Sequence, residues 1–432
     1  MTLSEFETVA DAAAVASQDP ESLFEGVDPA ALADRVGTPF HAYSAAAIRR
    51  RIAELQQALQ GLDALVCFAV KANPNRAILT LVADAGLGAD IVSGGELRRS
   101  LEAGIAPKRI VFSGVGKSEQ EIDAALAAGI ARFNLESRDE LECLDRLARE
   151  RGVEACAAVR INPDVDAGTH EKISTGRAEN KFGVPIDEAR CWFAERMRHP
   201  NVRLDGLHVH IGSQILDLEP FRRAFARVAA FRRELAAAGH AIASIDVGGG
   251  FGVRYRNGES RLDAQAWAGV LREAFADYDG RFVVEPGRWL VAEAGLLLTR
   301  VLRVKRGVER DFLVLDAAMN DLARPSLYDA WHEIVPLHGA ARAMRRYDVV
   351  GPVCETGDTF ARDRLLPECA AGDLVAILGT GAYGASMAST YNSRPLAAEV
   401  LLDDGRYSIV RRRQSYEEMT AGESAGEDWT TP

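Results

Sequence analysis

The chain has 432 residues, 47% of them hydrophobic, and a formal net charge of −12 at pH 7. This length allows two or three domains with a large core, and the negative charge argues against nucleic acid or an anionic membrane as the main partner. No apolar run approaches the length of a membrane-spanning helix. The six cysteines form no C-x-x-C pair, and the acidic N-terminus does not resemble a secretory signal, so we expect a reducing, cytoplasmic compartment.

The first part of the chain divides into an extension and a long repeating region. Residues 1–35 are rich in alanine and acidic residues, which predicts a weakly ordered extension. Residues 38–43 are expected to form an edge strand. From residue 44 to residue 290, short apolar runs alternate with helical patterns. The strands are expected at residues 65–71, 89–93, 109–113, 131–136, 155–162, 204–211, 244–248 and 281–285.

These eight β/α units predict a (β/α)8 TIM-type barrel. An open doubly wound sheet has the same alternation of strands and helices. The barrel is favoured because the carboxyl ends of its strands converge on one mouth, where polar side chains and glycine can form a site. The residues that close the expected strands are Lys71, Ser93, Ser113, Glu136, Arg160, His210, Gly248 and Glu285.

The last third of the chain has a different pattern. Residues 291–415 contain β-type runs without long intervening helices, which predicts a separate C-terminal all-β domain. We expect residues 36–43 to join this domain as its N-terminal strand, and residues 416–432 to form a polar tail.

Lys71 ends an apolar run, Leu65–Val70, that is predicted to form a strand buried on both faces. A lysine at this position is costly unless it is paired, or unless burial makes its amine neutral and reactive. Two interpretations follow: a lysine whose amine reaches solvent at the strand end, or a lysine that forms a Schiff base with a carbonyl compound. The stretch alone favours the first interpretation.

Two motifs at the ends of strands seven and eight indicate an anion site. Gly248–Gly252 is rich in glycine, so its backbone amides can surround an oxyanion, and barrels often bind phosphate at this place; a tight turn is the alternative. Glu285-Pro-Gly-Arg288 adds a carboxylate at the mouth and a cation suited to phosphate or carboxylate. A structural ion pair is the alternative for this motif.

His208 and His210 lie on one face of strand six, a pattern that also occurs in metal sites. No other expected strand ends in histidine, so we expect no metal. His210 at the mouth is interpreted as a ring that stacks on a flat ligand, with His208 packed one layer deeper.

Two later motifs are interpreted differently. Gly379–Gly384 matches G-x-G-x-x-G, but a helix after it would be too short to cross over a sheet, so we reject a dinucleotide site. Cys354 lies beside Glu355 at the end of a β-type run. A lone cysteine usually fills a core, but this pairing makes Cys354 a candidate acid.

Together these motifs resemble the fold-type III pyridoxal-phosphate decarboxylases, which combine an alanine racemase-like barrel with a β-domain. The resemblance covers residues 36 to 410. Two further stretches, Lys172–Gly183 and Asp321–Tyr328, resemble the diaminopimelate decarboxylase family of lysine biosynthesis. The matching motifs are F-A-V-K-A-N at Phe68, H-I-G-S at His210, G-G-G-F at Gly248, E-P-G-R at Glu285, G-P-V-C-E at Gly351 and G-A-Y at Gly381.

The resemblance implies a role for each matched residue. Lys71 would carry pyridoxal phosphate covalently, Glu285 would keep its pyridine nitrogen protonated, and His210 would stack on its ring. The implied catalytic residues are these three and Cys354, which would protonate the carbanion. The implied cofactor-binding residues are Lys71, His210, Ser213, Gly248, Gly249, Gly250, Glu285, Arg288 and Tyr383. The implied substrate-binding residues are Arg288, Arg324, Tyr328, Glu355 and Tyr383.

The resemblance also implies a homodimer in which Cys354 and Glu355 enter the site of the neighbouring subunit. The implied reaction converts meso-2,6-diaminopimelate, at its D-centre, to L-lysine and CO2. A substrate with two amino-acid ends needs cations and an anion at its far end, and Arg324 and Glu355 supply both charges. Residues 163–177 are long and polar for a βα connection, so we expect a lid over bound substrate.

Two other functions fit the same motifs. One is a decarboxylase of the same family for carboxynorspermidine, ornithine, arginine or a carrier-bound amino acid. Arg324, Tyr328 and Glu355 argue against it, and a substrate with only a far amine, such as ornithine, does not need the cluster from Arg324 to Tyr328. The other is a non-catalytic binding protein, which the retained Lys71 and glycine loop disfavour.

Overall fold

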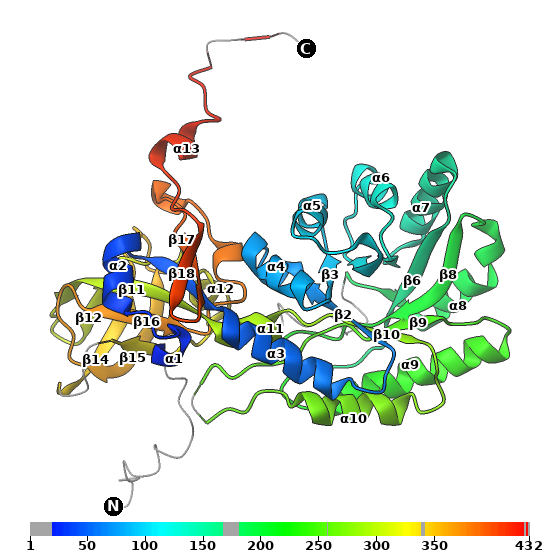
Figure 1. Ribbon diagram of the computed structural model, residues 1–432, viewed down its shortest axis with the longest axis horizontal. Coiled ribbons are helices and arrows are strands. Elements are labelled where there is room, and N and C mark those ends of the chain that lie inside the picture. Colours follow the sequence, from blue (N-terminus) through cyan, green and yellow to red (C-terminus); the bar gives the residue numbers. More distant parts are fainter. Residues whose placement is uncertain (1–19, 167–180, 257, 338–341, 427–428, 431–432) are drawn as a thin grey trace, which may run out of the picture.

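The computed structural model describes residues 20–166, 181–256, 258–337, 342–426 and 429–430. Figure 1 shows two parts, a β-sheet domain on the left and a barrel surrounded by helices on the right. The expected lid and the stretch Lys172–Asn180 fall largely on residues 167–180, which lie outside the described residues.

The barrel is a closed ring of eight parallel strands. β10 pairs with β2, and β5 pairs with β6, which closes the ring. The strands are β2 (Ala64–Ala69), β3 (Gly88–Ile91), β4 (Ile110–Phe112), β5 (Arg132–Leu135), β6 (Ala155–Asn162), β8 (Val202–His208), β9 (Ser244–Asp246) and β10 (Arg281–Val284). A short strand, β7 (Val184–Pro185), extends the sheet beside β6. The predicted barrel is confirmed, and the open doubly wound sheet is wrong.

Helices cover the outside of the barrel (Figure 1). Many begin at a short polar residue whose side chain accepts a hydrogen bond from a backbone amide of the first turn, as Ser118 does in a capping box with Glu121. In α4, Ile78, Leu79 and Val82 form a fully buried stripe against the strands. The helices are α3 (Ala45–Ala58), α4 (Arg76–Asp84), α5 (Gly94–Glu102), α6 (Glu119–Ala128), α7 (Arg138–Arg151), α8 (Ile186–Ala194), α9 (Glu219–Ala237) and α10 (Ala264–Ala274). Within the described ranges, no helix is both long and apolar enough to cross a membrane.

The second part is a mixed β-sheet in the order β15-β14-β12-β11-β1-β17-β18, with β16 pairing to β11 and β13. Its strands are β1 (Phe40–Ser44), β11 (Gly295–Lys305), β12 (Asp311–Leu315), β13 (Ile334–Pro336), β14 (Met344–Val350), β15 (Thr359–Pro367), β16 (Leu374–Leu378), β17 (Ala398–Asp403) and β18 (Arg406–Arg411). The predicted all-β domain is confirmed, including its N-terminal strand.

The position of β1 within the sheet corrects one expectation. β1 is not an edge strand: it lies between β11, to which it is antiparallel, and β17, to which it is parallel. All five residues are buried. Pro39 lies just before the strand, so β1 keeps its backbone donors for both neighbours.

The segment before β1 is also more ordered than its composition indicates. Residues 20–36 form α1 (Pro20–Leu23) and α2 (Pro29–Val36), so the expected weakly ordered extension is wrong for this part. Phe24 and Leu32 are buried and join the main hydrophobic core. Their burial stabilises this segment although its alanine-rich sequence has little periodic pattern. At the other end, α13 (Tyr416–Thr420) has no buried residue among those described.

Candidate active site

A cavity of about 480 Å³ lies at the carboxyl ends of the barrel strands and extends to the β-domain. It has the size of a pocket for a small cofactor with its substrate. The predicted residues that line it are Lys71, His210, Ser213, Gly250, Glu285, Arg288, Arg324, Tyr328 and Tyr383. The barrel contributes the first six and the β-domain the last three, so the site depends on both parts.

Lys71 lies in a single 3-10 turn, Val70–Ala72, directly after β2. Its Nζ atom is 2.7 Å from Oδ2 of Asp90, a fully buried carboxylate on β3, and the lysine side chain is 38% exposed, into the cavity that it lines. Burial alone lowers the pKa of Lys71, but the charges of Asp90 and Glu285 outweigh it and raise this pKa above its ordinary value. The amine is therefore held by a buried carboxylate at the cavity wall rather than extended to bulk solvent.

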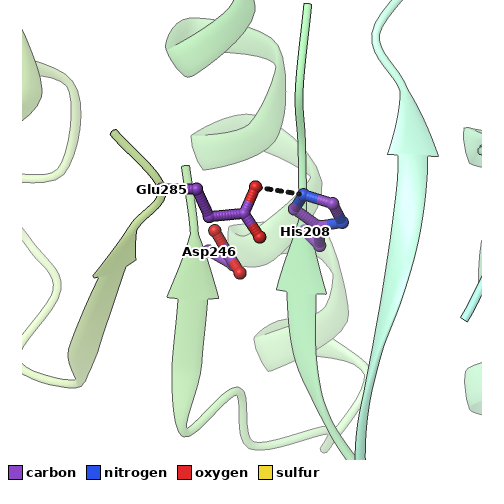
Figure 2. A group of neighbouring side chains, drawn as sticks. All are labelled: His208, Asp246 and Glu285. Atoms are coloured by element: carbon purple, nitrogen blue, oxygen red, sulfur yellow. Dashed lines mark ion pairs between the residues drawn. The ribbon is translucent and has the colours of Figure 1, made fainter. Parts of the chain in front are cut away.

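Glu285 lines the cavity and contacts polar groups on or after three other barrel strands, β4, β5 and β8. Its Oε1 accepts hydrogen bonds from Ser113 Oγ at 3.2 Å and from Asn134 Nδ2 at 3.3 Å. Its Oε2 is 3.5 Å from His208 Nε2, the ion pair drawn in Figure 2. Burial alone raises the pKa of Glu285, but His208 and Lys71 outweigh it and hold this pKa well below its usual range. Glu285 is thus a buried but charged carboxylate.

Asp246, at the end of β9, lies beside Glu285 in Figure 2. Burial and the charge of Glu285 raise the pKa of Asp246 well above its ordinary value, so the pair carries its negative charge on Glu285. His208, Asp246 and Glu285 place ligand atoms within 4.8 Å of one another, a spacing that a metal ion could also use. His210, the other imidazole of the H-x-H pattern, is not in this group, and the absence of a metal stays a prediction.

His210 is tied to the glycine loop. Its Nδ1 accepts a hydrogen bond from the backbone amide of Gly249 at 3.1 Å. Burial, followed by the charge of Arg160, lowers the pKa of His210 to about 3, so the ring is neutral at physiological pH.

The glycines of this loop are required by its close contacts. Gly248 and Gly250 have φ of +67° and +92°. A Cβ on Gly249 would overlap the carbonyl oxygen of Glu285, and one on Gly250 would overlap that of Gly212. The loop therefore packs directly against the backbone of neighbouring segments, and its Gly250 lines the cavity.

Arg288 provides a buried cation in the same cavity. It begins α11 (Arg288–Val291) and is 8% exposed. Its guanidinium donates to Ser213 Oγ at 3.1 Å and to the Tyr255 hydroxyl at 2.9 Å, and it lies 4.7 Å from the centre of the Tyr383 ring. Within the described part of the chain its Nε has no hydrogen-bond partner. A phosphate group fits this donor set.

Arg324 provides a second buried cation from the β-domain. It begins α12 (Arg324–Tyr328) and is 6% exposed. Its Nη1 is 2.8 Å from His332 Nε2, and its guanidinium lies 4.5 Å from the centre of the Tyr255 ring. Burial lowers the pKa of Arg324. An anionic ligand group here would offset the free-energy cost of removing the guanidinium from water.

Cys354 and Glu355 are not brought to this cavity. Both are exposed and, among the described residues, they lie outside its lining. The Cys354 amide donates to Asn392 Oδ1 at 3.1 Å. Their expected role in a neighbouring subunit stays a prediction.

The Gly379–Gly384 loop contributes to the site. After β16 it leads into a 3-10 turn, Ala385–Met387, rather than the crossover helix that a dinucleotide fingerprint requires. The amide of Tyr383 donates to the carbonyl of Ala72, next to Lys71, at 2.8 Å. This contact brings Tyr383 to the cavity.

Five residues of the site are absent from the sequence-based set: Asp90, Asn134, Asp246, Tyr255 and His332. Asp90 had a usable signal, because an acid inside an expected buried strand requires a partner. Tyr255 and His332 lie in loops, and the contact between Tyr255 and Arg324 depends on how the barrel meets the β-domain.

Comparison with known proteins agrees with this arrangement. The family described as "Pyridoxal-dependent decarboxylase, pyridoxal binding domain" matches residues 45–292. The diaminopimelate decarboxylase of Zymomonas mobilis is 47% identical over 91% of this chain and 94% of its own length. That of Pseudomonas aeruginosa is 48% identical over 94% of this chain and 98% of its own.

A solved structure shares the fold. The crystal structure of diaminopimelate decarboxylase from Helicobacter pylori complexed with L-lysine has a TM-score of 0.88 and 43% sequence identity. The alignment covers 91% of this chain and 98% of that one. The resemblance read from the motifs is confirmed, and the chain belongs to the pyridoxal-dependent decarboxylases and, within them, to the diaminopimelate decarboxylase family.

Proposed function

We propose that this chain decarboxylates meso-2,6-diaminopimelate at its D-centre, with bound pyridoxal 5'-phosphate, to give L-lysine and CO2. The observation that carries the proposal is one cavity that combines Lys71 and Glu285 with two separate buried cations, Arg288 and Arg324. The relatives that carry the name diaminopimelate decarboxylase, and the L-lysine in the Helicobacter pylori structure, support this substrate.

The residues of the cavity fit pyridoxal phosphate. Lys71 would hold its aldehyde carbon covalently and Glu285 would face its pyridine nitrogen. The backbone of Gly250 at the cavity and the Nε of Arg288, which has no hydrogen-bond partner among the described residues, suit its phosphate. The phosphate-binding residues in this proposal are Ser213, Gly248, Gly249, Gly250, Arg288 and Tyr383. When bound, the cofactor supplies an electron-accepting ring that stabilises the negative charge left as CO2 departs.

Protein groups around the cofactor ring would determine which atoms carry a proton. Glu285 stays ionised because its pKa is low, so it holds a proton on a ring nitrogen that it faces. His210 has a pKa of about 3, so it offers a neutral, flat ring and adds no charge that would oppose this proton. Asp90 keeps the Lys71 amine fixed at the cavity wall.

The far end of the substrate accounts for the second cation. Arg324 and Tyr328 bind the far carboxylate in this proposal, with Arg288 and Tyr383 beside them. Ornithine has no carboxylate there, so it would leave the buried Arg324 without an anionic partner. A site built to bind a polar group discriminates strongly against ligands that lack that group. Arg324 therefore favours diaminopimelate over the other amino acids of the family.

The active protein in this proposal is a homodimer. Cys354 and Glu355 are exposed on their own subunit, as residues that serve a neighbouring subunit would be in an isolated chain. There Glu355 binds the far ammonium group and Cys354 gives a proton to the carbon that lost CO2.

The test is a paired spectroscopic and kinetic measurement. The purified protein should show a visible absorption band that borohydride bleaches, with the label on Lys71. It should release CO2 and lysine from the meso isomer and not from the L,L or D,D isomers. Turnover of ornithine, arginine or carboxynorspermidine instead would favour another decarboxylase, and a cofactor band without any turnover would favour a binding protein.

A further inference from the structure

Two like charges share the cavity, and one aromatic ring contacts both of them. Tyr255 accepts a hydrogen bond from Arg288 Nη1 at 2.9 Å through its hydroxyl. The face of the same ring lies 4.5 Å from the guanidinium of Arg324, within the range of a cation–π contact. Two neighbouring buried cations repel each other, so each needs a fixed position if each is to bind a different anion.

The position of Tyr255 is itself fixed from two sides. Its backbone amide donates to Glu259 Oε2 at 3.2 Å in the loop after β9. Its ring packs against Gly379 of the β-domain, where an added Cβ would lie 3.2 Å from Tyr255 Cε1. Burial raises the pKa of the Tyr255 hydroxyl, but Arg288 and Arg324 outweigh it and lower this pKa, which is the effect of two cations on the same phenol.

His332 holds Arg324 from the other side. His332 Nδ1 is 2.7 Å from the carbonyl oxygen of Leu378, at the end of β16, so Nδ1 carries the proton and donates it. Nε2 is then the acceptor for Arg324 Nη1, 2.8 Å away. Burial, followed by the charge of Arg324, lowers the pKa of His332 to about 3, so the ring stays an acceptor at neutral pH. The His332 and Tyr255 rings also meet edge to face, with centroids 5.3 Å apart.

We infer that Tyr255 and His332 are positioning residues that assign the two cations to two anions. The hydroxyl of Tyr255 aims Arg288 at the cofactor phosphate, while the Tyr255 ring and His332 Nε2 aim Arg324 at the far carboxylate of the substrate. This inference rests on the proposed function. It makes substrate choice depend on two residues that do not react, because a carboxylate is recognised well only by a guanidinium held in a fixed orientation.

The experiment tests the two assignments with a separate substitution at each residue. His332→Asn keeps an amide near Leu378 but no longer reaches Arg324, whereas His332→Gln is the matched control that restores an acceptor near the position of Nε2. Tyr255→Phe keeps the ring beside Arg324 and removes only the hydroxyl bound to Arg288. The readouts are KM and kcat for meso-diaminopimelate, and the dissociation constant of pyridoxal phosphate from titration of the apoprotein.

We expect opposite patterns in the two residues. His332→Asn should raise KM for diaminopimelate by about tenfold or more without changing cofactor affinity, and His332→Gln should recover most of the loss. Tyr255→Phe should weaken cofactor binding by about fivefold or more and leave KM unchanged at saturating cofactor. Thermal unfolding midpoints equal to wild type confirm that each variant is folded.

Several results would overturn the inference. If the folded Asn and Gln variants of His332 have the same KM as wild type, His332 does not aim Arg324. If Tyr255→Phe raises KM as much as it weakens cofactor binding, the Tyr255 hydroxyl does not assign Arg288 to the cofactor phosphate. A wild-type protein that releases no CO2 from diaminopimelate refutes the proposed function instead, and the cofactor titration of Tyr255→Phe then still decides the Arg288 part.

Discussion

The exposed position of Cys354 makes the proposed sharing of active sites measurable. Lys71 lines the cavity, whereas Cys354, among the described residues, lies outside the lining of its own subunit. In a shared arrangement each site therefore takes its lysine from one subunit and its cysteine from the other. Lys71→Ala and Cys354→Ala proteins should each be nearly inactive alone, because every site in either homodimer lacks one of the two groups.

Mixing the two variants should restore activity by a defined amount. When equal amounts are unfolded together and refolded, about half of the dimers are mixed by two-fold statistics. Each mixed dimer then has one site with both defects and one intact site. CO2 release should recover to about a quarter of wild type in the mixture. It should reach about half of wild type in mixed dimers isolated through two different tags.

The experiment has a control variant and a result that would refute the shared site. Cys191 is another exposed cysteine, on α8 and away from the cavity lining, so Cys191→Ala should keep full activity and show that loss of a surface thiol is not itself harmful. If both residues serve the same subunit, every site in a mixed dimer keeps one defect. Mixed dimers that are isolated with two tags and show no recovery would therefore refute the shared site.

Three further predictions follow from buried groups. Arg324→Ala removes one partner of a desolvated ion pair, which costs about 2–5 kcal/mol; kcat/KM for diaminopimelate should fall at least about 30-fold, with cofactor affinity unchanged in apoprotein titrations. Asp90→Asn removes the carboxylate 2.7 Å from Lys71 Nζ and so lowers the pKa of the amine. The apoprotein should then take up pyridoxal phosphate faster at pH 7, measured by the rate at which the visible band appears, and an unchanged rate would contradict the pairing. His41, buried on β1, has its pKa lowered by burial from 6.5 to about 4. Below pH 6.5 the unfolded chain binds a proton that the folded chain does not, so acidification to pH 4 should cost roughly 3 kcal/mol of stability. His41→Leu should lose less of its thermal midpoint between pH 7 and pH 4.5 than wild type, and equal losses would count against this account.

The barrel was predictable because its signal is repeated along the chain. Each apolar run is short and ends in a polar residue or glycine, and several are followed by a helix that begins at a capping side chain such as Ser118. The order of strands in the β-domain was not predictable in this way. β1 looked like an edge strand, and its place between β11 and β17 depends on pairings with strands far along the sequence.

The site residues also divide into those with a local sequence signal and those without one. Lys71, Gly248 and Glu285 have local signals, since a charge or a glycine ends a buried strand. Tyr255 and His332 have none, because a tyrosine and a histidine in loops are common and gain a role only when two guanidinium groups lie against them. Such contacts between loop residues and arginines are set by tertiary packing rather than by the spacing of residues in the sequence.

The central place of β1 has a consequence for how the protein is made. Because synthesis runs from the N-terminus, β1 emerges before the whole barrel, whereas its partners β11 and β17 emerge only after it. A growing chain can complete the barrel while β1 still presents two unpaired edges, each able to pair with another extended segment. The β-domain closes only when the chain returns from the barrel. Chains truncated before β17 should therefore contain a folded barrel and an incompletely paired β1 strand that promotes aggregation.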